Sequence, residues 1–424
     1  MSFADHYFSK QKGFIPCPDG PPSGQLRFIV VVPACREPNL ITSLDSLNHC
    51  DAPRGHVEVI VVLNLAENAD PDDYTKSLKT ADEIRAWMKE HSRPEFRFIL
   101  IEDLKMPVRD AGVGLARKTG MDQALYRFNC LNNPGGFILS YDADTLCKSN
   151  YFTAIESVLN NFPNTRGINI YFEHPVTGTE YPETVYQGII LYEMHLRYLN
   201  LMTRSTGFPH AWHTVGSCFG VRAESYAREG GMNRKKAGED FYFLHKIIPL
   251  GEYREVNTTC VMPSPRESDR VPFGTGAAIR KYVASADSSL LTYAPQCFYD
   301  LKMFFSRIPE LFLLTDEATV ESLSLFNEPL KGFLKGIAAI EGIREIRANS
   351  GSLQAFINRF YRWFDAFRII KFLNHASLYY PQIPVKNAAL VYLKDTAIPF
   401  SVKDPSAIEL LTVLRKIERS RIGG

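Results

Sequence analysis

Residues 28–32 read Phe-Ile-Val-Val-Val, a continuous apolar run of mostly β-branched side chains that ends at Pro33. Similar runs occur at 57–63, 96–101 and 137–140. The stretches with helical periodicity between them are residues 39–48, 74–90 and 112–128. Short apolar runs that alternate with helices are typical of a parallel sheet buried on both faces. The sequence therefore predicts an α/β fold with a mostly parallel sheet flanked by helices.

The character of the sequence changes along its 424 residues. Residues 1–25 are polar and rich in Pro and Gly, which predicts a loose N-terminal arm. After about residue 287 glycines are few and long helical periodicities prevail, which predicts a helical C-terminal region over 287–424. The alternating strands and helices lie between these parts, so we expect one α/β domain over 26–286.

Charge and cysteine content exclude several classes of protein. Lys and Arg total 48 against 47 Asp and Glu, so the net charge is +1. A balanced surface argues against nucleic-acid binding as the main task. The eight cysteines include no Cys-X-X-Cys spacing, which argues against a structural zinc site and a disulfide scaffold. We therefore expect reduced thiols in a cytoplasmic protein.

The sequence also bears on membranes. No apolar run approaches the roughly 20 residues that span a bilayer, and no signal peptide is evident. Residues 353–373 combine aromatic side chains at helical spacing with Arg359, Arg362, Arg368 and Lys371. Such a basic amphipathic stretch can lie on the inner face of a membrane, although aromatic stripes more often belong to a helical core. Both interpretations stay open, and peripheral membrane contact is one of them.

The most informative motif is Asp142-Ala143-Asp144, called DAD below, which follows the fourth apolar run. Ligands of open α/β sheets bind at the carboxyl ends of the strands. Two carboxylates there suit Mg²⁺ or Mn²⁺ that bridges a diphosphate. A turn whose aspartate caps the next helix would explain the same residues. Asp142 and Asp144 are thus candidate metal ligands.

Two pairs of cations could bind anions. Arg117 and Lys118 lie in the first turns of the helix that precedes the fourth run, a position that suits an anion site; a solvated helix face is the alternative. Arg266 and Arg270 lie four apart in the Pro-, Ser- and Gly-containing stretch 263–276. Guanidinium groups on such a loop suit phosphate or carboxylate, while ion pairs within the loop are the alternative.

These motifs occur in a fixed order that carries more information than any one of them. They are VVPACRE at 31–37, GVGLARKTG at 112–120, DAD at 142–144, GSCFGVR at 216–222, GGM at 230–232 and GED at 238–240. In this order, over residues 27–276, the chain resembles the family 2 glycosyltransferases of the GT-A fold. The resemblance implies a hexosyltransferase that uses Mn²⁺ or Mg²⁺ to move a sugar from a nucleoside diphosphate donor to a hydroxyl acceptor.

The resemblance also implies a donor site. In the family, residues matching 33–37 cradle the nucleotide, the first DAD aspartate contacts ribose or sugar, and the second binds the metal. Asn64 stands where the family usually has an acidic pair; it can still bond a uracil edge, so UDP-sugars are favoured although the base stays open. The donor-binding residues implied are Pro33, Ala34, Glu37, Asn64, Arg117, Lys118, Asp142 and Asp144.

An acceptor site follows from the same resemblance. Asp240 matches the carboxylate that serves inverting members as general base, although Glu239 and Asp240 could simply begin a helix. The residues implied in acceptor or phosphate binding are Trp212, His213, Gly216, Glu239, Arg266 and Arg270. A packed aromatic loop is the other interpretation of Trp212 and His213. Residues 256–276 lack the family's late histidine ligand, so either DAD and the diphosphate hold the metal alone or an arginine replaces part of its charge.

Three other functions stay open. A retaining transferase would share DAD and use no base. A sugar nucleotidyltransferase also combines an α/β sheet with metal and acids, but it usually has a Gly- and Arg-rich loop after the first strand, where this chain has Pro-Ala-Cys-Arg-Glu. A non-catalytic scaffold on a degenerate transferase fold is the third, and intact DAD and Asp240 argue against it. The sequence leaves the sugar, the acceptor and the oligomeric state undetermined.

Overall fold

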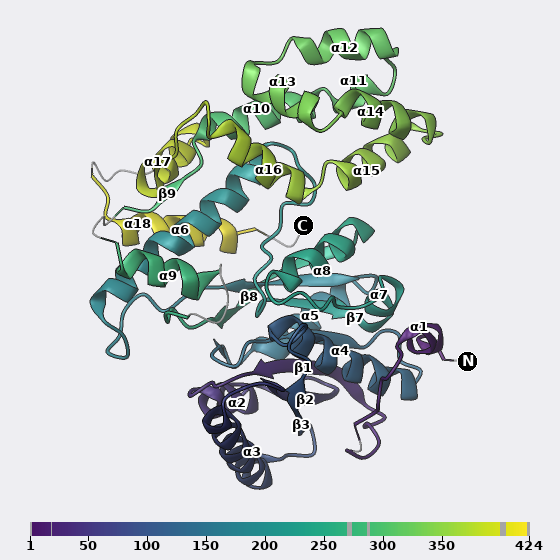
Figure 1. Ribbon diagram of the computed structural model, residues 1–424, viewed down its shortest axis with the longest axis vertical. Coiled ribbons are helices and arrows are strands. Elements are labelled where there is room, and N and C mark those ends of the chain that lie inside the picture. The colour runs from purple at the N-terminus through teal and green to yellow at the C-terminus, as the bar shows by residue number, and fades with distance from the viewer. Residues whose placement is uncertain (1, 18, 269–273, 286–288, 399–403, 422–424) are drawn as a thin grey trace. The chain divides into compact units, whose positions relative to one another are not determined.

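Eight strands form one large sheet in this computed structural model, which describes residues 2–17, 19–268, 274–285, 289–398 and 404–421 (Figure 1). Their bounds are β1 Leu26–Ala34, β2 His56–Ala66, β3 Phe96–Met106, β4 Phe137–Ser140, β5 Leu146–Cys147, β6 Gly167–Phe172, β7 Phe219–Arg222 and β8 Tyr253–Met262. The order across the sheet is β3-β2-β1-β4-β7-β6-β8-β5. Pairs β1–β2, β2–β3, β1–β4 and β6–β8 are parallel, whereas β7 and β5 run antiparallel to their neighbours. The sheet is therefore mostly parallel, as the sequence predicts.

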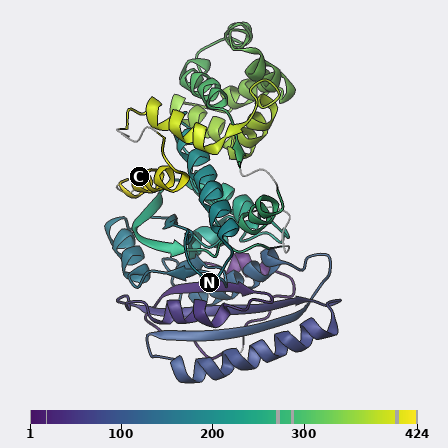
Figure 2. The same ribbon diagram turned by 90° about the vertical axis from the view of Figure 1, so that its left-hand side faces the viewer.

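Helices flank the sheet and confirm the expected α/β class. They are α2 Leu40–Asn48, α3 Pro71–His91, α4 Val113–Cys130, α5 Tyr151–Asn161, α7 Ala223–Arg228 and α8 Glu239–Ile247, with a 3₁₀ turn η1 Ile248–Leu250. Helix α4 packs against β1 and β2, and α3 packs against β2 and β3, where it runs alongside the strands (Figure 2). The predicted helices 39–48, 74–90 and 112–128 match α2, α3 and α4 closely.

The centre of the sheet is buried because β1 carries apolar side chains on both faces. Val30, Val31 and Val32 are completely buried. Helix α4 approaches β1 so closely that a Cβ on Gly120 would lie 2.4 Å from Val31 Cγ1. Only glycine fits at that contact, so the last glycine of the 112–120 motif serves helix–sheet packing.

The N-terminal segment is less loose than the sequence predicts. Helix α1 Asp5–Lys10 packs its buried Tyr7 against α4, where Tyr7 Oη donates to Asp122 Oδ1 at 2.7 Å. Ser2 Oγ donates to the Asn129 carbonyl at 2.8 Å. A phenol that finds a buried carboxylate is held in place, so the expectation of a loose arm is wrong for this helix.

The chain divides into two compact units. The sheet unit comprises Met1–Pro182, Thr214–Arg280 and Ile417–Gly424, and the helical unit comprises Glu183–His213 and Lys281–Lys416. Segment 183–213 thus belongs to the helical unit, although it lies inside the range 26–286 assigned to one domain above. The reason is packing: its helix α6 Glu183–Ser205 contacts the C-terminal helices, and Tyr198 Oη donates to the Tyr293 carbonyl at 3.0 Å.

The helical unit confirms the predicted helical C-terminal region. Besides α6 it contains α10 Pro295–Ser306, α11 Ile308–Leu311, α12 Asp316–Ser324, α13 Glu328–Gly336, α14 Ala339–Ala348, α15 Leu353–Trp363, α16 Ala366–Ala376, α17 Val385–Asp395 and a short ladder of β9 Leu291–Thr292 with β10 Ile383–Pro384. Helices α9 Thr275–Val283 and α18 Ala407–Arg419 cross the boundaries between the units.

The aromatic stripe of residues 353–373 contributes to the core of this unit. Phe356, Phe360 and Phe372 are completely buried, and the Phe360 ring lies 5.8 Å from that of Phe304. Asp365 separates two helices within the stripe, because its side chain caps α16 at the Arg368 amide, 2.9 Å away. Among the residues described, no helix combines the length and apolarity needed to cross a membrane.

Candidate functional site

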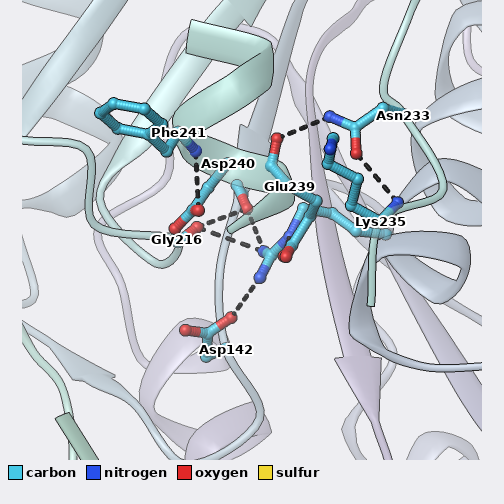
Figure 3. A network of polar contacts seen from close by, with 9 residues as sticks. Asp142, Gly216, Asn233, Lys235, Glu239, Asp240 and Phe241 are labelled. Carbon is cyan, nitrogen blue, oxygen red and sulfur yellow. Dashed lines mark hydrogen bonds and ion pairs between the residues drawn. The ribbon is translucent and has the colours of Figure 1, made fainter. Parts of the chain in front are cut away.

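Polar side chains from distant parts of the sequence meet at the carboxyl end of the sheet (Figure 3). Asp142 and Asp144 follow β4, and Glu37 follows β1, which is paired with β4 in parallel. Gly216 precedes β7, the other neighbour of β4, and Asp240 lies in the first turn of α8. The parallel and antiparallel pairings therefore bring these residues to one edge, where ligands of α/β sheets bind.

Arg117 is the central cation of this group. It projects from α4 with only 3% of its side chain exposed. Its Nη2 lies 2.9 Å from Asp142 Oδ1, and its Nε lies 3.1 Å from Glu239 Oε1. Burial alone would lower the pKa of Arg117, but the neighbouring carboxylates more than offset it and raise the pKa above its usual range. Arg117 is therefore permanently charged and joins the DAD turn to α8.

Two further groups hold the Arg117 guanidinium. Its Nη1 donates to Ser140 Oγ and to the Gly216 carbonyl, the latter at 3.2 Å. Ser140 Oγ in turn donates to the same carbonyl at 2.6 Å. Sequence reasoning missed Ser140; its signal was a hydroxyl at the end of an otherwise apolar strand. All three nitrogens of the guanidinium are hydrogen-bonded, so the side chain is held firmly.

Gly216 lies close to two carboxylates, at a position where a side chain would be crowded. A Cβ at this position would lie 3.2 Å from Asp240 Oδ2 and 3.6 Å from Asp142 Oδ2. It would also lie 3.0 Å from Arg117 Nη2. Figure 3 shows Asp142, Gly216 and Asp240 as neighbours. The structure thus brings together three residues predicted from motifs that lie almost a hundred residues apart.

Asp240 has the environment of a proton acceptor. Burial raises its pKa to about 7, the negative charge of Glu239 adds to the effect, and Arg117 opposes it. Its Oδ1 accepts a hydrogen bond from the Phe241 amide at 2.7 Å, and its Oδ2 lies on the side of Gly216. Glu239 is fixed by Arg117 and by Asn233, whose side chain donates to the Glu239 carbonyl at 2.9 Å. Asn233 is a second residue that sequence reasoning missed.

A second arginine, Arg266, forms an ion pair with Asp144, the other carboxylate of DAD. Arg266 Nε is 2.8 Å from Asp144 Oδ2, and Arg266 Nη2 donates to Glu37 Oε2. Burial raises the pKa of Glu37 to about 7 and also raises the pKa of Asp144; like charges nearby add to both shifts, and Arg266 opposes them. A cation that binds beside the carboxylates of Glu37 and Asp144 would therefore stabilise their charged forms.

One predicted site residue, Lys118, lies elsewhere in the sheet unit. Lys118 does not join Arg117: its Nζ lies 2.8 Å from Asp122 Oδ2 and 2.9 Å from Tyr7 Oη, in a buried cluster under α1. Adjacent residues on a helix point about 100° apart, so the two cations serve different surroundings. Trp212 and His213 belong to the helical unit, where the Arg204 guanidinium lies 4.8 Å from the Trp212 ring centroid.

The remaining predicted residues lie at strand ends, except for one that is not among the described residues. Pro33 and Ala34 are buried at the end of β1, and Asn64 is buried near the end of β2. Arg270 lies outside the described residues. The first turn of α4 is partly covered, because a Cβ on Gly114 would meet the Lys235 carbonyl oxygen at 1.9 Å.

The side chains at DAD suit a hard divalent cation. Among the described residues, no group of three or more His, Cys, Asp or Glu is arranged to hold a metal ion. The carboxylates of Asp142 and Asp144 are 36% and 21% exposed, so water and a ligand can reach them. Mg²⁺ and Mn²⁺ bind at one or two carboxylates together with waters and phosphate oxygens, so the donor set fits them.

Comparisons with known proteins give distant likenesses to solved glycosyltransferases. No family model and no curated protein matches this sequence. S. aureus TarS 1-349 in complex with UDP-GlcNAc matches with 15% identity and a TM-score of 0.38, over 84% of this chain and 91% of that chain. The mannosyltransferase PcManGT from Pyrobaculum calidifontis, in complex with GDP-Man and Mn²⁺, matches with 16% identity and a TM-score of 0.37, over 88% and 91%.

Two longer proteins match over part of their length. The match to the longer TarS structure covers 56% of this chain and 35% of that chain, with 16% identity and a TM-score of 0.33. GalNAc-T7 with UDP, GalNAc and Mn²⁺ matches over 61% and 48%, with 14% identity and a TM-score of 0.37. Sequence identities and TM-scores this low assign neither a substrate nor an activity to this chain. A function has to be argued from the chain's own residues.

Proposed function

We propose that this chain is a glycosyltransferase that moves a sugar from a nucleoside diphosphate donor to a hydroxyl acceptor. The observation that carries the proposal is the meeting of Asp142 and Asp240 beside Gly216, with Arg117 fixing the first. A transferase needs a donor site and a proton acceptor that face the same small space. The order of motifs that resembles family 2 glycosyltransferases adds support from the sequence.

In this proposal the donor lies across the ends of β1, β2 and β4. Pro33, Ala34 and Asn64 border the nucleotide, and Asp142, oriented by Arg117, contacts the ribose or the sugar. Asp142 and Asp144 would hold Mn²⁺ or Mg²⁺, which when bound neutralises charge on the leaving diphosphate. A UDP-sugar is our first choice of donor, because the Asn64 amide can bond to a uracil edge.

Asp240 takes the proton of the acceptor hydroxyl in this proposal. A general base works best when its pKa lies near the operating pH, and burial raises that of Asp240 to about 7. Its Oδ2 lies beside Gly216, where we place the acceptor oxygen. Attack from the side opposite the leaving diphosphate inverts the anomeric carbon. We place the enzyme in the cytoplasm, because its eight cysteines show no Cys-X-X-Cys spacing and suit a compartment that keeps thiols reduced.

A thermal-shift panel tests the donor site. UDP-, GDP-, dTDP- and CDP-sugars are added with and without Mn²⁺ to wild type, Asp144→Asn and the control Asp110→Asn, which changes an acid beside Arg234. We expect one nucleotide to raise the melting temperature in the presence of metal, because a ligand of the native state stabilises it. The shift should persist in the control and vanish in Asp144→Asn. No shift with any nucleotide contradicts the proposal.

Turnover of Asp240→Asn tests the base. Asparagine can still accept the Phe241 amide bond, so the fold is retained while the base is lost. We expect turnover to fall by about 10²- to 10⁴-fold with nucleotide binding unchanged. Full activity would remove the inverting assignment and favour a retaining enzyme. Release of pyrophosphate from a nucleoside triphosphate would instead indicate a nucleotidyltransferase.

A further inference from the structure

One guanidinium joins the ends of two strands in the candidate site. Arg266, which follows β8, reaches Asp144 after β4 with its Nε at 2.8 Å, and its Nη2 donates to Glu37 after β1. The Glu37 side chain is only 1% exposed, so this charge depends on protein partners rather than water. Arg266 therefore supplies positive charge at the carboxylate that would bind a divalent cation.

Arg266 and Arg117 differ in how firmly they are held. The Arg117 side chain is 3% exposed and bonds Ser140 and Gly216 besides two carboxylates. The Arg266 side chain is 21% exposed, and its contacts with Glu37 and Asp144 come from the side chain alone. Its backbone amide bonds separately to Ser264 Oγ at 3.3 Å, so the guanidinium can turn while the backbone stays in place.

A divalent cation and Arg266 compete for the carboxylate of Asp144. Both are positively charged, so each repels the other when both approach this carboxylate. A guanidinium that leaves Asp144 has a favourable new partner when a diphosphate is present, since its planar array of N–H groups matches phosphate oxygens. Without a diphosphate, the Arg266 guanidinium has no such new partner when it leaves Asp144.

We propose that Arg266 occupies, in the ligand-free chain, the cation position on Asp144, and that it gives up this carboxylate when metal and diphosphate arrive together. The inference rests on the proposed function for the identity of the ligand, although the competition itself concerns only the metal. It follows that the chain binds a divalent cation weakly by itself and more tightly with a nucleoside diphosphate. Because binding linkage is reciprocal, metal should strengthen nucleotide binding by the same factor.

A titration with Mn²⁺ alone tests the competition. Free Mn²⁺ is measured by electron paramagnetic resonance on full-length wild type and Arg266→Met, without nucleotide, after melting curves have confirmed folding. We expect Arg266→Met to bind Mn²⁺ about tenfold more tightly, the size of effect that a partly exposed charge-assisted contact gives. Arg266→Lys keeps the charge but cannot hold both carboxylates, so it should fall between the two.

Two controls separate direct competition from a general effect of charge. Arg85→Met removes an arginine of the sheet unit that is paired with Asp82 at 2.8 Å, so it leaves Asp144 untouched and should change Mn²⁺ affinity less than about twofold. Asp144→Asn should abolish Mn²⁺ binding in both backgrounds. Adding UDP should tighten Mn²⁺ binding in wild type more than in Arg266→Met.

The outcomes distinguish this inference from the proposed function. Mn²⁺ affinity in Arg266→Met that equals wild type, or no Mn²⁺ binding by that variant, overturns the exchange. If nucleotides bind in a metal-dependent way and the affinity is still unchanged, the exchange fails and the transferase proposal stands. If Mn²⁺ binds more tightly to Arg266→Met and no nucleotide binds any variant, the exchange stands and the transferase proposal fails.

Discussion

Replacing Arg117 by methionine should destabilise the protein mainly through Glu239. The substitution leaves two carboxylates without their guanidinium partner, but they differ in access to water. The Asp142 side chain is 36% exposed and can be hydrated, whereas Glu239 is 4% exposed and cannot. Removing one partner of a buried ion pair costs about 3–5 kcal/mol, and since one of the two acids regains water we expect about 3 kcal/mol.

Thermal melting of the full chain measures this loss. A loss of about 3 kcal/mol should lower the melting temperature of the sheet unit by about 6–12 °C, given the size of that unit. Arg109→Met is the matched control, because Arg109 is exposed and its removal should change stability by less than about 0.5 kcal/mol. The double variant Arg117→Met with Glu239→Gln should recover part of the loss, because the buried charge is then absent.

The reasoning on Arg117 fails under either of two results. A loss below about 1 kcal/mol in Arg117→Met would mean that Glu239 finds water or another partner, contrary to its burial. A double variant no more stable than Arg117→Met would mean that the buried charge of Glu239 is not the source of the loss. Restoration by Glu239→Gln, measured as a double-mutant cycle, is the specific signature of the ion pair.

Three further predictions follow from the site. If Asp240, with its pKa raised to about 7, must be ionised to act, turnover should rise about tenfold from pH 6 to pH 8, and the residual rate of Asp240→Asn should lack this step. Lys118→Met should leave nucleotide binding intact and cost about 2–4 kcal/mol, because Asp122 stays buried without its cation; weakened binding at unchanged stability would contradict this. Gly216→Ala should lower turnover about tenfold to a hundredfold, because its Cβ would lie 3.0 Å from Arg117 Nη2 and 3.2 Å from Asp240 Oδ2; wild-type rates would contradict this.

The sequence by itself determined the sheet and the position of DAD. Apolar β-branched runs such as 28–32 can be buried on both faces only inside a layered α/β structure, so local chemistry was sufficient. Asp142 and Asp144 then had to lie at the carboxyl edge because they directly follow a buried strand. Glu37 was named as a donor-binding residue through the resemblance to family 2 glycosyltransferases, and it follows β1, the parallel neighbour of β4.

The tertiary structure alone decided the partners of these residues. Arg117 and Lys118 are neighbours in sequence, yet one enters the site and the other packs beneath α1, because the helix turns their side chains apart. The bridge from Arg266 to Asp144 spans more than a hundred residues, and no local pattern encodes it. Periodicity shows which residues a strand or helix buries, whereas pairing between distant segments depends on how the elements pack. DAD and both arginines could therefore be named as candidates from the sequence, but the pairing of Arg117 with Asp142 and of Arg266 with Asp144 could not.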